Sequence, residues 1–311
     1  MTSIMTNPGA MTALQALKAT NKAIDLTQNR ISTGYRVSEA SHNAAYWSIA
    51  TTMRSDNKVL STVQDALGLG AGLVDTAYTA TETVIGYVDD IKMKVAAATQ
   101  GGLDRTKIQS EIAELIAGIR SVVTSASYAG SNWLSTEATT PATQEIVSSF
   151  TRTANGGIAL GTLTVTMADF ALIDASTASG TSQVGLLENY TFSYIPAGQT
   201  SSTSVTGFDL TSIDVTTGDL ELLLAGVDSI LKELADRAAN LGATKSRIDL
   251  QKDFVSNLMD ALERGIGQLV DADMEEESTR LQALQVQQQL GIQALSIANG
   301  NAQNILSLFR Q

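Results

Sequence analysis

The stretch VQDALGLGAGLVDTAYTATETVIGYVDDIKMKV, residues 63–95, decides the fold class of this chain. Alternating steps of four and three residues from Val63 reach an apolar side chain at every position except Gly70 and Thr81. Spacing sustained over this length is typical of a helix that packs against other helices in a coiled coil. The predicted seam is Val63, Leu67, Gly70, Val74, Ala77, Thr81, Val84, Val88, Ile91 and Val95.

The same spacing returns in the C-terminal part of the chain. From Leu224 to Leu269 only Lys245 and Lys252 interrupt it. It predicts a helix over 220–269, about 75 Å long at about 1.5 Å per residue. A shorter strip predicts a third helix and consists of Ile108, Ile112, Leu115, Ile119 and Val122.

Two weaker series lie at the ends of the chain. They place amides or glycine at seam positions, so these helices bury too little apolar surface to offset their ordering entropy alone. We expect them to order only when something packs against them. The N-terminal series is Leu14, Leu17, Asn21, Ile24, Gln28 and Ile31, and the C-terminal series is Leu281, Leu284, Gln288, Gly291, Leu295, Ala298, Ala302, Ile305 and Phe309.

The composition excludes most enzyme chemistry. The 311 residues include no cysteine and one histidine, His42, which removes disulfides, thiolate ligands and paired-histidine metal sites. The net charge of −12 argues against nucleic acid and anionic membranes as partners. The N-terminus lacks the basic and apolar regions of a secretory signal peptide, and no apolar run is long enough to predict a membrane span.

Charge and composition divide the chain into three parts. Residues 136–218 carry one basic and seven acidic residues and are rich in Thr, Ser and Gly, unlike the flanks on either side. Within them, Gly161–Met167 and Tyr190–Tyr194 predict strands. The predicted fold is mainly α: a long α-helical coiled-coil rod formed by the N- and C-terminal segments, with a small β-rich inserted outer domain.

Three motifs could in principle support catalysis or ligand binding, but each has a simpler structural explanation. No sequence pattern supplies His42 with a catalytic partner. The glycines of 68–72 lack the lysine of a phosphate loop, and close helix–helix approach explains them. The acidic cluster 271–277 has Glu276 where a calcium loop needs glycine, which favours a helix start with a solvated face. We therefore predict no catalytic, cofactor-binding or metal site, and a protein that is not an enzyme.

The two ends of the chain resemble the bacterial flagellins. QNRISTGYRV, residues 28–37, is similar to their N-terminal signature. LQVQQQLGIQALSIAN, residues 284–299, and QNILSLF, residues 303–309, are similar to their C-terminus. AYWSIATTMRSDN, residues 45–57, resembles flagellins of rhizobia and related alphaproteobacteria. The resemblance covers about 1–135 and 220–311.

The resemblance implies a domain plan and a function. Residues 1–40 and 272–311 would form a terminal coiled-coil inner-core domain, 41–135 and 219–271 a helical-rod domain, and 136–218 a surface-exposed variable domain. The chain would be a structural subunit that polymerises into the flagellar filament for swimming motility. It would be exported unfolded through the flagellar type III apparatus and secreted to the extracellular flagellum. The implied partners are further copies, paralogous flagellins, the filament cap, hook-junction proteins and an export chaperone.

The expected functional residues are interface residues. We expect the two terminal helices to pair through their apolar positions, and Arg30, Arg36 and Arg54 are candidate donors of inter-subunit ion pairs. The predicted coiled-coil and subunit interface is Leu14, Leu17, Ile24, Ile31, Leu281, Leu284, Leu295, Ile305 and Phe309.

Two other functions stay open at this stage. A flagellin-like junction protein between hook and filament has similar ends, and polymerisation of the pure protein into long filaments would exclude it. An enzyme with its activity in 136–218 would have only carboxylate and hydroxyl chemistry there, because that segment has no histidine, cysteine or lysine.

One departure from the family pattern gives a prediction. Many flagellins carry an Arg-Glu-Leu stretch that the innate-immune flagellin receptor recognises. Here Asp90 stands where a cationic or amide residue is expected, and Met93 and Lys94 replace the Glu-Leu pair. We predict that this chain evades the receptor, and a full response to nanomolar protein in a receptor reporter assay would refute this.

Overall fold

A computed structural model describes residues 7–100, 102–136, 143–153, 157–174, 185–197, 199 and 201–308, with the side chains of Ala168 and 301–308 left out. The chain forms two compact units. The terminal unit combines residues 1–58 with 259–311, and the central unit spans 59–258. The three-domain division expected from the sequence stays a prediction.

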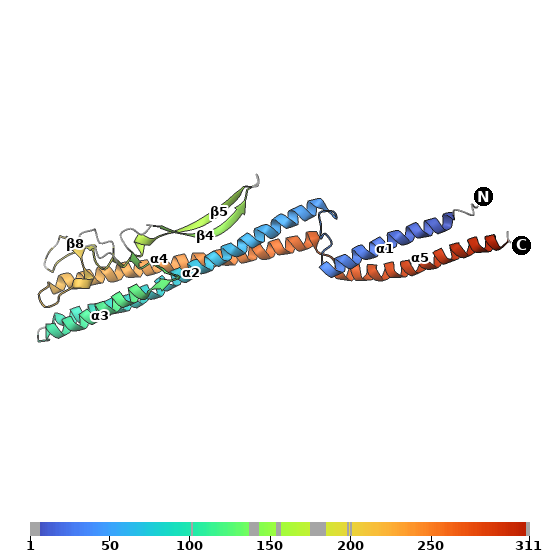
Figure 1. The fold of residues 1–311 in the computed structure, drawn as a ribbon. Coiled ribbons are helices and arrows are strands. Elements are labelled where there is room, and N and C mark those ends of the chain that lie inside the picture. Colours follow the sequence, from blue (N-terminus) through green and yellow to red (C-terminus); the bar gives the residue numbers. More distant parts are fainter. Residues whose placement is uncertain are drawn as a thin grey trace. The chain divides into compact units, whose positions relative to one another are not determined.

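Long helices make up most of the described chain (Figure 1). They are α1 (Pro8–Thr33), α2 (Ala44–Ala98), α3 (Arg105–Ser125), α4 (Leu220–Val270) and α5 (Met274–Leu308). Short strands fill the interval between α3 and α4. The prediction of a mainly α chain with long terminal helices and a small β-rich insert is confirmed.

Ion pairs fix the antiparallel register of α2 and α4 in the central unit. Lys92 of α2 pairs with Asp228 of α4 at 2.7 Å, and Asp75 of α2 pairs with Lys245 of α4. The two α2 positions are as far apart in sequence as the two α4 positions, so the helices keep one register between them. Hydrogen bonds from Lys232 and Lys92 lower the pKa of Asp228, so it stays ionised well into the acid range.

Every position of the seam predicted over 63–95 is buried in the central unit. Thr81 is accommodated because its hydroxyl donates to the carbonyl of Ala77 at 2.8 Å. The series predicted for α4 consists of two columns, each a set of positions seven residues apart. One column is buried: Val227, Leu234, Leu241, Ile248 and Val255.

The second α4 column and part of α3 differ from prediction. Ile230 is buried where Leu231 was expected, and Lys252 is exposed. On α3 the buried residues include Ile116 and Val123 in place of Leu115 and Val122. Stepping by fours and threes locates the helix but leaves the exact face uncertain by one residue, because neighbouring apolar residues compete for the core.

The strands of the insert form small two-stranded sheets. The longest is the antiparallel hairpin of β4 (Thr143–Arg152) and β5 (Ile158–Thr166), and β7 (Tyr190–Tyr194) pairs with β8 (Thr203–Phe208). The two strands predicted from sequence are therefore confirmed as β5 and β7. The remaining strands are β1 (Ser127–Tyr128), β2 (Ser131–Asn132), β3 (Ser135–Thr136) and β6 (Ile173–Asp174).

Glycines on the long helices receive side chains of this strand-rich region. A Cβ at Gly70 would lie 2.8 Å from the side chain of Ile146, and one at Gly72 would lie 2.7 Å from the ring of Tyr128. On α4 a Cβ at Gly226 would lie 2.5 Å from the ring of Phe208. Close helix–helix approach, the explanation given above for the glycines of 68–72, is therefore wrong at Gly70 and Gly72. The missing side chains make room for strand residues.

We predict that Gly226→Ala destabilises the central unit by about 1–3 kcal/mol, because Phe208 is buried and has little room to move. Urea unfolding followed by circular dichroism measures the change. Gly86→Ala is the matched control, since nothing lies within 4 Å of its Cβ position. As an exposed helical substitution it should stabilise by about 0.5–1 kcal/mol. Equal shifts in the two variants would contradict the docking role of Gly226.

Candidate functional site: the terminal helix pair

The helices α1 and α5 lie antiparallel in the terminal unit (Figure 1). Asn7 caps α1 by accepting from the backbone N–H of Ala10, and its amide donates to the carbonyl of Ala298 at 2.9 Å. Further along, the amide of Gln288 donates to the side-chain oxygen of Asn21 at 2.7 Å. Asn21 and Gln288 interrupt the predicted apolar series, and both interhelical hydrogen bonds connect the two helices.

The pair has little core of its own. Among the described side chains, α1 buries only Ile24 and Thr27, and α5 buries only Glu277. The half-buried positions of α5 from 281 to 298 are those of the predicted seam: Leu281, Leu284, Gln288, Gly291, Leu295 and Ala298.

On α1 the inward face is shifted from the predicted one. Asn21 and Gln28 are exposed, whereas Thr20 is half-buried and Thr27 is buried. Small side chains let two helices approach closely, so a face chosen by hydrophobicity alone misses these threonines. Leu17 follows the prediction, and its Cδ1 lies 3.2 Å from the Cβ position of Gly291.

The remaining predicted interface residues differ in exposure. Leu14 is 43% exposed, and Ile31 is half-buried. Ile305 belongs to α5, although its side chain is not described, and Phe309 lies outside the described residues. Contacts of these residues with other copies stay a prediction.

A buried ion pair connects the last turns of α1 to the first turn of α5, and we call this end the base of the helix pair. Arg30 of α1 donates to Glu277 of α5 at 2.7 Å, and Arg280 donates to the same carboxylate oxygen at 3.3 Å. The Glu277 side chain is only 5% exposed, and its other oxygen has no hydrogen-bond partner among the described residues. Sequence reasoning missed this pair, although Glu277 stands four residues before Leu281, where the predicted seam would continue.

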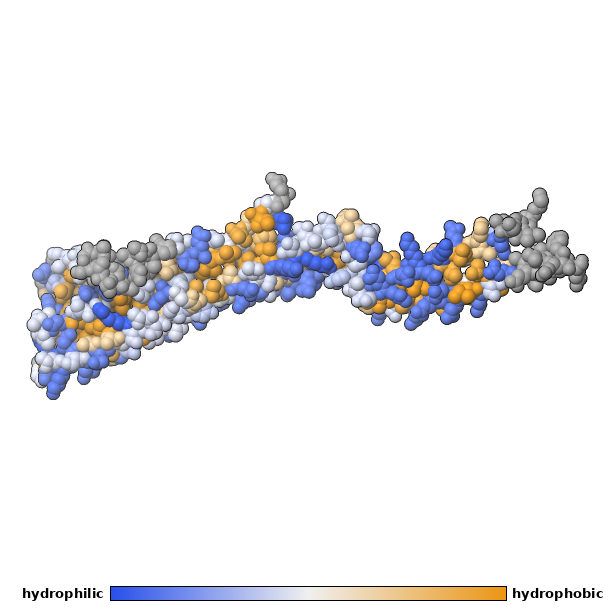
Figure 2. All heavy atoms as spheres, viewed as in Figure 1, coloured by the Kyte–Doolittle hydropathy of each residue, from blue (hydrophilic) through white to orange (hydrophobic). Residues whose placement is uncertain are grey.

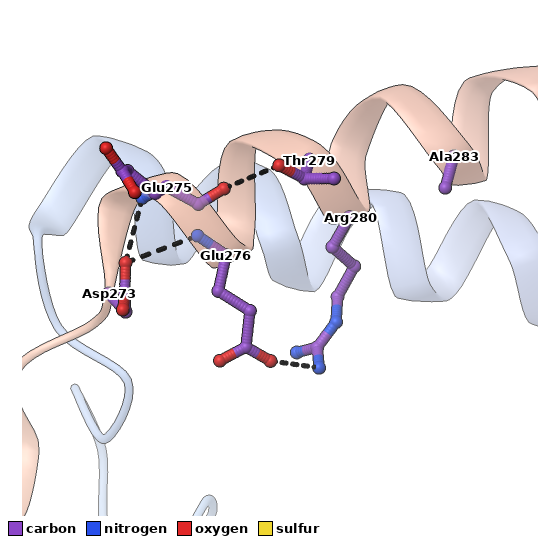
Figure 3. Close-up of a pocket in the computed structure, with 6 residues that line it drawn as sticks. All are labelled: Asp273, Glu275, Glu276, Thr279, Arg280 and Ala283. Atoms are coloured by element: carbon purple, nitrogen blue, oxygen red, sulfur yellow. Dashed lines mark hydrogen bonds and ion pairs between the residues drawn. The ribbon is translucent and has the colours of Figure 1, made fainter.

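The acidic cluster begins α5, as expected, and lines an open recess (Figure 3). Asp273 caps the helix by accepting from the backbone N–H groups of Glu275 and Glu276. Glu276 pairs with Arg280 at 2.8 Å. The expected solvated face is correct for Asp273, Glu275 and Glu276, but wrong for the buried Glu277.

The other two arginines also have partners within the chain. Arg36 donates to the carbonyls of Gln268 and Leu269 and so satisfies the end of α4. The Arg54 guanidinium lies 4.6 Å from the ring centre of Tyr35. The part of both arginines in inter-subunit ion pairs stays a prediction.

The outer faces of both helices carry large apolar side chains. Figure 2 shows hydrophobic side chains among hydrophilic ones on the surface of this pair. The most exposed examples are Met11 at 60% and Ile297 at 66%. Exposed apolar surface of this density marks an interaction site. The exposed large apolar residues of the two helices are Met11, Leu14, Met274, Val286, Leu290, Ile292 and Ile297.

The described residues offer no alternative site. No group of three or more His, Cys, Asp or Glu side chains is placed to hold a metal ion there, and no described helix is long and apolar enough to cross a membrane. Among the described residues, the one side-chain hydrogen bond of His42 is with the nearby hydroxyl of Ser38, at 3.3 Å. In the central unit Asp90 and Met93 are exposed, and Lys94 pairs with Glu111.

Comparison with known protein families matches the same two terminal parts of the chain that resemble flagellins in sequence. Residues 4–139 match the bacterial flagellin N-terminal helical region, and residues 224–309 match the C-terminal helical region. The chain belongs to the bacterial flagellin family. Over the full length of both chains it is 49% identical to Flagellin C of Rhizobium meliloti (strain 1021) and 50% identical to a flagellin of Brucella melitensis biotype 1.

Membership of this family fixes the kind of protein. Flagellins are structural subunits of the extracellular flagellar filament, so this flagellin is a structural protein and not an enzyme. The family models leave residues 140–223 unmatched, which include most of the strand-rich insert. The resemblance expected for both ends of the chain is therefore confirmed.

The buried ion pair gives a prediction for the assembled protein. We expect Glu277→Ala to destabilise the terminal unit by about 2–3 kcal/mol, somewhat less than the loss of a fully buried partner, because Arg30 keeps some exposure. Calorimetric melting of filaments measures the effect. Glu263→Ala is the matched control, since it removes an exposed carboxylate of the same unit, where ion pairs contribute about 0–1 kcal/mol. Similar melting of the two variants would contradict a structural role for the buried pair.

Proposed function

We propose that the α1–α5 pair is the surface through which copies of this flagellin join in the filament core. The observation that carries this proposal is the exposure of large apolar side chains on both helices, beside a pair that buries very little itself. Each such side chain contributes about 1.5–3 kcal/mol when it is fully buried. Neighbouring copies supply the cover that this chain lacks.

The proposal extends to the interface residues predicted from sequence. Leu17, Leu281, Leu284 and Leu295 are half-buried, so each retains surface that a neighbouring copy can cover. In this arrangement 1–40 and 272–311 form the inner core, 41–135 and 219–271 the next shell, and 136–218 face solvent. Unfolded export and partners at the filament cap, the hook junction and an export chaperone belong to the same proposal.

Seeded growth tests the proposal directly. Purified protein is heated to monomers, cooled and mixed with filament seeds, and the full chain is compared with a 1–271 truncation by electron microscopy. We expect long filaments from the full chain and helical monomers from the truncation, because the truncation lacks α5. If neither grows on seeds, the junction-protein function takes precedence and the proposal fails.

Leu295→Ala supplies a residue-level prediction. Leu295 lies on the inward face of α5, so its truncation should lower the melting temperature of the filament before it affects the central unit. Calorimetry of filaments and circular dichroism of monomers separate the two effects. The matched control is Lys107→Ala on α3, whose side chain is 82% exposed. Unchanged filament melting in Leu295→Ala would contradict the interface assignment.

A further inference from the structure

Charge is distributed unevenly along the terminal helix pair. The charged residues of α5 all lie between Glu275 and Arg280, and the 28 residues from 281 to 308 contain none. Over 271–280 the chain carries five acidic residues and one basic residue. Arg30 balances one of these carboxylates from α1, and the base of the pair keeps a surplus of negative charge.

Opposite the uncharged part of α5, α1 exposes two lysines. Lys18 and Lys22 are one helical turn apart on the same face. Neighbouring α1 residues face uncharged α5 positions, since Leu17 packs at Gly291 and Asn21 bonds to Gln288. Neither lysine has an ion-pair partner within the part of the chain that the structure describes.

The acidic surplus lies out of reach of these lysines within one chain. Because Arg30 binds Glu277, it is the α1 residue that lies beside the acidic start of α5. Lys22 and Lys18 precede Arg30 by eight and twelve residues, or about 12 and 18 Å of helix at about 1.5 Å per residue. A lysine side chain cannot close that distance along its own pair. Opposite charges are therefore present on one molecule but displaced along it.

The acidic recess at the start of α5 is shallow, and its charge is complementary to that of a lysine side chain. Asp273, Glu275 and Glu276 provide carboxylates, of which Glu276 is already paired with Arg280 on the same surface. Thr279 and Ala283 are small side chains along which methylene groups can lie (Figure 3). The Glu275 carboxylate has no hydrogen-bond or ion-pair partner among the described residues. The recess is open on its outer side, so a neighbouring molecule has access to it.

We propose that Lys18 and Lys22 of one copy bind the acidic recess of a second copy, an inference that rests on the proposed function. Within one helix pair, the lysines and the acidic recess lie at different positions along the helix axis. When the lysines of one copy bind the recess of the next, the two helix pairs are therefore offset along that axis. Contacts between unlike patches repeat from copy to copy and produce an open polymer. The ion pairs thus select the offset, while the apolar side chains around them provide most of the burial.

Charge reversal tests this in seeded growth. One variant carries Lys18→Glu and Lys22→Glu, a second carries Glu275→Lys and Glu276→Lys, and a third combines all four substitutions. We expect each double variant to raise the critical concentration at least about tenfold at low salt, and the combined variant to return to within about threefold of the wild type. Lys252→Glu and Glu263→Lys, at exposed α4 positions, are the matched controls and should grow normally.

A crosslink keeps the test independent of how well the reversed chains fold. The chain has no cysteine, so copies with Lys22→Cys can be mixed with copies carrying Glu275→Cys, grown on seeds and oxidised. A disulfide needs Cα atoms within about 7 Å, so covalent dimers on a denaturing gel would support the contact. No dimers, or double variants that grow like the wild type, would overturn it. Discrete wild-type dimers in place of filaments would also overturn the offset contact. Failure of the wild type to grow on seeds would instead overturn the proposed function, and this inference with it.

Discussion

A pair of helices has one seam, and whatever lies outside that seam faces solvent. In the terminal unit the seam between α1 and α5 is narrow and contains threonine, glycine and glutamine beside its leucines. The ordering of two long helices costs conformational entropy for every residue. A seam of this quality offsets that cost poorly, and the exposed apolar side chains of the pair add to the shortage. The need for additional cover shapes this end of the flagellin.

The central unit meets the same constraint within one chain. A third helix and the strand-rich insert lie with α2 and α4, and the seam of α2 is buried throughout 63–95. Ion pairs at Lys92–Asp228 and Asp75–Lys245 then fix the register of helices whose apolar faces alone would tolerate a shift. In the terminal unit, Asn21–Gln288 and Arg30–Glu277 have the corresponding role. In both units apolar burial provides stability and polar pairs select the alignment.

The sequence predicts what depends on local periodicity. The long helices, the strands β5 and β7 and the seam of α5 follow from spacing alone. The exact inward face of α1 does not, because Thr20 and Thr27 are there for their small size rather than their hydrophobicity. The Arg30–Glu277 pair could not be predicted either, since it depends on the register between segments separated by most of the chain. Gly70 and Gly72 stand out in the helical pattern, but the side chains that contact them come from strands whose position no helical pattern reveals.

The docking of strand residues onto helical glycines separates two kinds of position in the insert. Ile146 and Phe208 each contact a helix where any added atom would collide, so changes at these residues must be matched on the helix. Exposed strand residues such as Ile158 and Leu160 carry no such obligation. Substitutions at the exposed strand residues of the insert therefore have little effect on packing. Substitutions at the residues docked on helical glycines require a matching change on the helix. A flagellin built in this way can renew the surface it presents to its surroundings while its attachment points stay fixed.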